Sequence, residues 1–175
     1  MKKGISPVIS TILLILIAIA ALGILYSFIY PLIRDRLQKA QECSESKEEF
    51  KIEESNYTCY SEISGKKVVG VTIKRGTNKL PLKGLSIIIS GIDSQLFNIE
   101  DGETLTGVKM SDGSQTLELP KDGERRTYLI ETDLGIVDHV SVAPITESDY
   151  RCDIISEADI GMCEWSQNHK FGLKL

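Results

Sequence analysis

An uncharged run near the N-terminus constrains this chain more than any other feature. No residue from Ile5 to Ile33 is charged at neutral pH; two lysines precede the run and an Arg-Asp-Arg triplet closes it. As an α-helix, the run would extend about 43 Å at ~1.5 Å per residue, whereas the hydrocarbon core of a bilayer is ~30 Å thick. A helix in a soluble core needs only one apolar stripe, yet residues 12–25 are apolar all round. The run therefore predicts a segment that enters or crosses a membrane.

Three fates of the run remain open. A secretory signal would use Lys2 and Lys3 as its positive region and be cut after 18–20 (Ala-Ile-Ala). The mature chain would then begin with the apolar stretch ALGILYSFIYPLI, whereas polar sequence normally follows such signals. An uncleaved run would be a permanent anchor. Cleavage in front of the run, between Gly4 and Ile5, would remove the lysines and keep the whole helix.

The stretch KKGISPVISTILLILIAIAALGIL resembles the N-termini of archaeal type IV pilins and, more loosely, of archaeal flagellins (archaellins). In such proteins a short basic leader ends in glycine, so the resemblance implies a leader of residues 1–4 that a prepilin peptidase cuts between Gly4 and Ile5. Bacterial pilins carry a glutamate at the fifth mature position, which here is Ile9, and the Q-x-S-x-E signature of another archaeal class is missing. The resemblance is therefore to the ISPV-type group.

The resemblance implies a structural subunit of a surface filament, with other pilin-like subunits, the processing peptidase and the membrane as its partners. Before assembly the helix would lie in the cell membrane with Lys2 and Lys3 on the cytoplasmic side. Once these charges are removed, helices that are apolar on every face can leave lipid by packing against one another in an extracellular filament. The alternative is a single-pass, membrane-anchored domain that acts as a binding protein or as an accessory part of a secretion or motility machine.

The last residues of the run and those just after it predict where the helix ends. Pro31 predicts a bend or an end of the helix near Tyr30, followed by a charged, helix-friendly stalk as far as about residue 42. Tyr26 and Tyr30 fit the aromatic belt found at membrane surfaces. The chain is thus expected to consist of a helix and stalk over residues 5–42 and a domain over residues 43–175.

The domain is predicted to be an antiparallel β-sandwich, which gives the chain an α+β fold. Short β-branched or alternating segments, separated by turn residues, recur about every ten residues without intervening helical periods, and an immunoglobulin-like arrangement is expected. The predicted strands are 67–75, 85–90, 104–110, 116–119, 127–131 and 137–145, with weaker candidates at 55–61 and near residue 152.

The four cysteines are Cys43, Cys59, Cys152 and Cys163, two near each end of the predicted domain. Their spacings do not match the short C-x2-C pairs typical of zinc sites. An even number behind a membrane-directed segment predicts disulfides in an oxidising compartment, and four free thiols are the alternative. Of the three possible pairings, Cys43 with Cys59 and Cys152 with Cys163 closes the smallest loops, but the sequence leaves all three open.

Few residues suggest a chemical site. Asn56 begins the sequon Asn-Tyr-Thr and is a candidate for glycosylation. The net charge of −5 argues against nucleic acid as a partner, and the absence of catalytic or dinucleotide motifs predicts a non-enzymatic chain without cofactor or metal. His139 is expected to be a solvent-facing strand histidine. Asp101, Asp112 and Asp122 are expected to be hairpin residues rather than calcium ligands.

Overall fold

The computed structural model describes residues 7–63, 65–78 and 80–163. The chain divides into two units, a helical unit up to Gln41 and a β-sheet unit from Glu42 onward. One long apolar helix followed by antiparallel sheets confirms the α+β class. The expected cleavage point between Gly4 and Ile5 lies outside the described residues.

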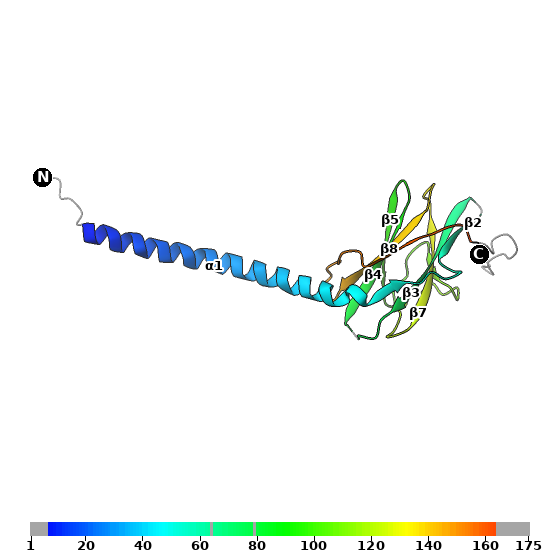
Figure 1. Cartoon of the computed structure of the whole chain (residues 1–175), viewed down its shortest axis with the longest axis horizontal. Coiled ribbons are helices and arrows are strands. Elements are labelled where there is room, and N and C mark those ends of the chain that lie inside the picture. The colour runs from blue at the N-terminus through cyan, green and yellow to red at the C-terminus, as the bar shows by residue number, and fades with distance from the viewer. Residues whose placement is uncertain (1–6, 64, 79, 164–175) are drawn as a thin grey trace. The chain divides into compact units, whose positions relative to one another are not determined.

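Helix α1 runs from Pro7 to Glu45 without interruption (Figure 1). The expected end near Tyr30 is wrong, because the helix continues through Pro31. A proline removes one backbone donor, and the turns on both sides keep theirs, so one missing hydrogen bond does not end the helix. Tyr26 and Tyr30 lie one turn apart and their rings stack, with centroids 5.3 Å apart.

After the last residues of α1, the β-sheet unit continues with the short 3-10 helix η1 (Ser46–Glu48) and contains nine strands among the described residues. Their bounds are β1 Phe50–Ile52, β2 Cys59–Ile63, β3 Lys66–Arg75, β4 Leu82–Ser90, β5 Ser94–Glu100, β6 Val108–Met110, β7 Arg125–Thr132, β8 His139–Thr146 and β9 Ser156–Asp159. All the ladders between these strands are antiparallel.

The strands form two sheets with an immunoglobulin-like order. One sheet runs β1-β3-β7-β6, with β2 also paired to β3, and the other runs β5-β4-β8-β9. Strand β3 pairs with β7 along one edge, so β1 and β2 follow each other along its opposite edge. If β1 and β2 are counted as two halves of a first strand, the sheets read A-B-E-D and C′-C-F-G, which is the order of an immunoglobulin-type sandwich with one added strand.

Four of the six predicted strands are confirmed, and the other two and the weaker candidates need correction. Strands β3, β4, β7 and β8 match the predicted segments closely. Of 104–110 only β6 is a strand, and 116–119 contributes a single isolated bridge, between Thr104 and Thr116. The weak candidate at 55–61 becomes β2, and the one near residue 152 becomes β9, a few residues later. Strands β1 and β5 were not predicted.

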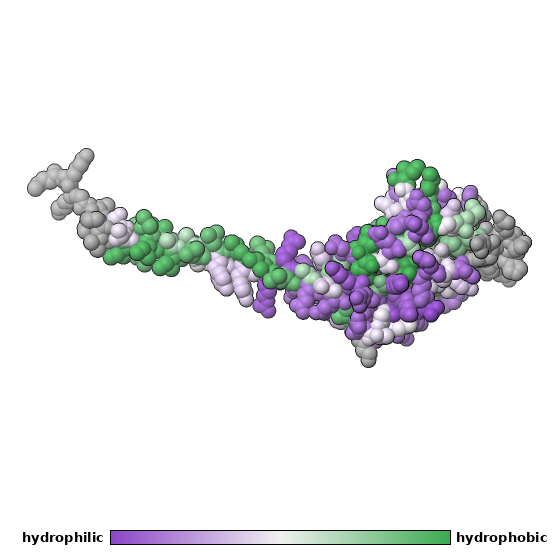
Figure 2. Space-filling model, in the orientation of Figure 1, coloured by the Kyte–Doolittle hydropathy of each residue, from purple (hydrophilic) through white to green (hydrophobic). Residues whose placement is uncertain are grey.

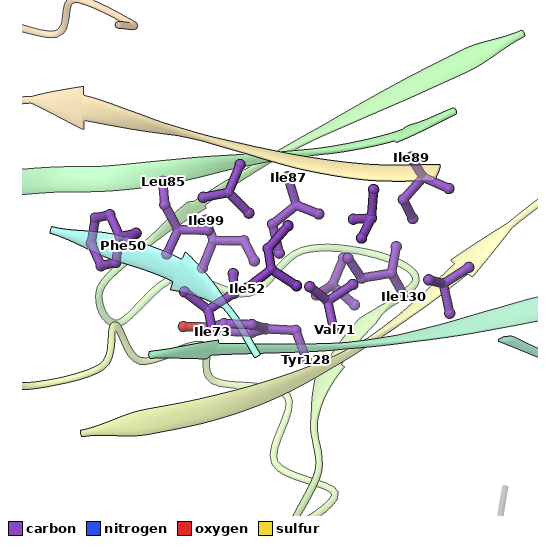
Figure 3. Packing of buried hydrophobic residues seen from close by; sticks show 14 of the residues in the cluster. Phe50, Ile52, Val71, Ile73, Leu85, Ile87, Ile89, Ile99, Tyr128 and Ile130 are labelled. Carbon is purple, nitrogen blue, oxygen red and sulfur yellow. The ribbon is translucent and has the colours of Figure 1, made fainter. Parts of the chain in front are cut away.

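Apolar side chains from both sheets interlock between the layers (Figure 3). Val71, Ile73 and Tyr128 from the five-stranded sheet face Leu85 and Ile87 from the four-stranded sheet, and all five are fully buried. The buried hydroxyl of Tyr128 donates a hydrogen bond to the Glu118 carbonyl oxygen at 2.8 Å. Burial raises the pKa of Tyr128 well above its ordinary value. The β-sheet unit therefore has a core of its own.

Candidate functional site: the apolar helix and the disulfide-linked edge of the domain

Large apolar side chains cover most of α1 between residues 9 and 33, and Figure 2 shows the visible face of this stretch as mostly apolar. Its large side chains there are 48% to 69% exposed, so the chain itself buries none of them. Among the described residues, this is the one helix long enough and apolar enough to cross a membrane.

The exposed apolar surface is too large to be left in water. Seventeen large side chains are exposed between Ile9 and Ile33. At ~1.5 kcal/mol or more for each, leaving them in water would cost on the order of tens of kcal/mol, against a net stability of ~5–15 kcal/mol for an ordinary domain. The helix therefore needs lipid or other protein around it.

Polar groups on this helix are compatible with an apolar environment. The Ser27 hydroxyl donates to the Ile24 carbonyl oxygen at 2.7 Å, so it is satisfied within the helix. The first ion pair follows the apolar run, where Lys39 Nζ lies 3.0 Å from Asp35 Oδ2, one turn away. The charged boundary expected from the sequence therefore coincides with the end of the membrane-compatible surface.

All four cysteines form disulfides, but not in the pairing with the smallest loops. Cys43 is bonded to Cys152 and Cys59 to Cys163, over separations of 109 and 104 residues. The local pairing is wrong because the fold places the first and last strands of the sandwich side by side. A loop of that length is worth about 4.7 kcal/mol on the chain-entropy model, rather than ~3 kcal/mol for a short one.

Hydrogen bonds join the same two segments between the disulfides. The Ile52 N–H donates to Ser156 Oγ at 3.0 Å. Further along, Tyr60 N–H donates to the Gly161 carbonyl and Cys163 N–H donates to the Tyr60 carbonyl, both at 2.9 Å. The segment after β9 thus lies parallel to β2 and closes this side of the sandwich. We call residues 43–63 and 152–163 together the disulfide-linked edge.

A buried ion pair lies at the start of this edge. Glu49 is fully buried, and its Oε1 accepts a hydrogen bond from Arg75 Nε at 2.9 Å. The Arg75 guanidinium also donates to the carbonyl oxygens of Leu80 and Pro120 and lies over the Phe50 ring, 5.8 Å from its centroid. The sequence did not single out this pair, because nothing in the charged stretch around Glu49 distinguishes the one glutamate that is buried.

Asn56 lies exposed in the turn between β1 and β2. The sequon threonine, Thr58, is held inside this turn, where its hydroxyl donates to the Glu53 carbonyl at 2.6 Å and accepts from the Thr72 N–H at 3.3 Å. Asn56 is thus placed where a sugar would project from the domain, and its glycosylation stays a prediction.

The other candidate residues have local partners. Asp101 Oδ1 accepts from the Leu119 N–H at 3.0 Å, and Asp112 Oδ1 accepts from the Ser114 N–H at 2.8 Å. Asp122 Oδ1 lies 3.7 Å from Arg75 Nε. Over the described part of the chain, His, Cys, Asp and Glu side chains form no group of three or more able to hold a metal ion.

His139, at the start of β8, is one-third exposed and faces the acidic side chains of β9. Its Nδ1 lies 2.9 Å from Asp159 Oδ1, and its Nε2 lies 3.5 Å from Glu157 Oε2. The hydrogen bond to Asp159 raises the pKa of His139 above its ordinary value, and Glu157 acts in the same direction. His139 is therefore part of a surface ion cluster across two strands.

The helix and the disulfides together indicate a membrane-anchored or membrane-directed chain whose domain lies in an oxidising, extracellular environment. No family model matches the chain, and no curated protein matches it.

Proposed function

We propose that this protein is a non-enzymatic structural subunit of a type IV pilus-like surface filament. The observation that carries the proposal is a helix whose large apolar side chains from residue 9 to residue 33 are all exposed, so the chain itself does not cover them. The residues in front of it, KKGISPVI, are the ones that resemble an archaeal pilin leader and its junction.

Removal of residues 1–4 would convert a membrane-anchored precursor into an assembly subunit. It deletes the charges of Lys2 and Lys3, which hold the helix in place on the cytoplasmic side. It leaves the apolar surface unchanged, and copies of the helix packed side by side cover that surface as lipid did. Repeated head-to-tail contacts of this kind extend into a filament, with the disulfide-linked domain facing outward for surface contact or adhesion.

The test is the mature N-terminus of the protein in a host with its native processing enzymes. We expect a start at Ile5 by intact mass and N-terminal sequencing, and we expect Gly4→Arg to abolish both this cleavage and recovery in sheared surface filaments. Gly135→Arg is the matched control, because Gly135 is exposed and has open space beside it. Normal cleavage and assembly of the Gly4→Arg protein would contradict the proposal.

The same measurement separates the other fates of the helix. A wild-type start at Met1 would favour the single-pass anchored domain, acting as a binding protein or as an accessory part of a secretion or motility machine. A start at Ala21 would mean an ordinary secreted protein and would exclude both membrane readings.

A further inference from the structure

Strand β5 is an end strand of the four-stranded sheet. It pairs with β4 over all seven residues, from Ser94 to Glu100, without a break in register. On its other side, none of the strands in the described part of the chain pairs with it. Its row of outward backbone donors and acceptors is therefore open to another strand.

The other three sheet edges offer much less. Strand β6 is three residues long, and β9 is four residues long and leads into the segment that pairs with β2. The edge formed by β1 and β2 is interrupted by the turn around Asn56 and covered at its far end by residues 161–163. Within the described residues, β5 is the one long and regular open edge.

Strand β5 also lacks the features that usually prevent edge pairing. Its sequence, SQLFNIE, has no lysine, arginine or proline, and its ladder with β4 has no bulge. Its one charge, Glu100, is bound to Lys83 Nζ at 3.2 Å. Leu96 is 41% exposed beside half-buried Ile88, its partner on β4. Ile92, at the tip of the β4–β5 hairpin, is 82% exposed, and Figure 2 shows this tip as apolar.

We propose that β5 is an interaction surface for a second copy of this chain, with the two β5 strands paired antiparallel. In the register centred on Phe97, Phe97 lies opposite its own copy, Leu96 opposite Asn98, and Ser94 opposite Glu100. Two four-stranded sheets then become one sheet of eight strands.

This register is self-complementary in charge and in shape. Glu100 lies opposite a serine rather than a second glutamate, so the strand's only charge meets no like charge. The two Leu96 side chains are diagonal neighbours on the outer face, where they extend the apolar strip that begins at Ile88. Phe97, which packs at the margin of the core, gains an aromatic partner across the joined edge. No other open edge in the described chain is long and regular enough to pair with all seven residues of β5.

The contact is twofold and isologous, unlike the head-to-tail contacts of a filament. It concerns the domain alone and does not rest on leader cleavage, so either proposal can fail without the other.

The first test measures self-association of the full chain in detergent by sedimentation and chemical cross-linking. Leu96→Lys places two lysines on neighbouring strands at a position already exposed to solvent, so the fold is kept while pairing is opposed. We expect the dimer dissociation constant of Leu96→Lys, calculated from the dimer fraction, to be at least ~10-fold higher than that of wild type. Tyr57→Lys introduces a lysine at another exposed side chain, away from β5, and should leave the dimer unchanged. An equal dimer fraction in wild type and Leu96→Lys would overturn the proposal.

The second test locates the contact. Benzoylphenylalanine in place of exposed Asn98 is irradiated in an equal mixture of isotopically light and heavy chains. We expect light-to-heavy cross-links that map to residues 94–98. Helix association in detergent gives cross-links elsewhere, and these would be unaffected by Leu96→Lys. Cross-links confined to other segments, capture of a different protein, or a chain that stays monomeric would each overturn the proposal.

Discussion

The ionisable side chains of the domain act in two different settings. Glu49 and Arg75 form a buried pair, in which loss of Arg75 would leave the buried Glu49 carboxylate without its ion-pair partner. His139 and Asp159 pair at the surface, where Asp159 is 97% exposed and solvent weakens the attraction. The buried pair therefore serves the local structure, whereas the surface pair supplies a pH dependence.

We predict that the His139 cluster stabilises the domain more in mild acid than in mild alkali. Because the folded-state pKa of His139 is raised, its contribution is complete below the unfolded value of ~6.5 and is lost as the pH rises through the folded value. The exposure of the pair limits the effect to below about 1 kcal/mol. The measurement is the difference in unfolding free energy between wild type and His139→Gln from pH 5 to pH 8, which cancels the titration of other groups. A difference that does not shrink with rising pH would contradict this.

At the scale of elements, the local sequence pattern was sufficient to predict a helix or strand whose residues all share one environment. The uncharged run predicted α1, because apolarity on every face requires no knowledge of the rest of the fold. Strands β3 and β4 were found because β-branched residues fill both of their central stretches. Strand β5 was missed because, at an open edge, polar and apolar side chains occupy both faces. The break that separates β1 from β2 could not be predicted either. The turn between them lies against Gly70 of β3, and this contact exists only in the folded domain.

We predict that Gly70→Ala displaces the turn between β1 and β2. A Cβ at Gly70 would lie far inside van der Waals contact with the Tyr57 carbonyl oxygen, which is backbone and has little freedom to move. Moving it would also disturb the Thr58 hydrogen bonds beneath the turn. We expect a loss of about 1–3 kcal/mol in unfolding free energy. Gly135→Ala, with open space around it, is the control, and equal stability of the two variants would refute the packing argument.

At the scale of the whole molecule, the disulfide pairing shows what a sequence alone does not contain. Cys59 and Cys163 are bonded because the sandwich brings β2 beside the segment that follows β9, and that neighbourhood exists only after both sheets have formed. Loop size favours the local pairing, and the topology overrides it. Because both bonds join the same two segments, neither is independent of the other.

Removing both disulfides should therefore cost more unfolding free energy than the sum of the costs of removing each one alone. With one bond present, the other closes a ring of only about 27 residues, worth about 3.6 kcal/mol on the chain-entropy model, whereas the last remaining bond closes more than 100 residues and is worth about 4.8 kcal/mol. We expect Cys43→Ala with Cys152→Ala, or Cys59→Ala with Cys163→Ala, to remain folded at reduced stability. All four changes together would cost about 8 kcal/mol, which is comparable to the whole stability of a domain. Denaturant unfolding of the three variants measures these losses. If the loss of unfolding free energy in the four-alanine protein were no larger than the sum of the losses in the two double variants, the coupling of the two disulfides through one edge would be contradicted.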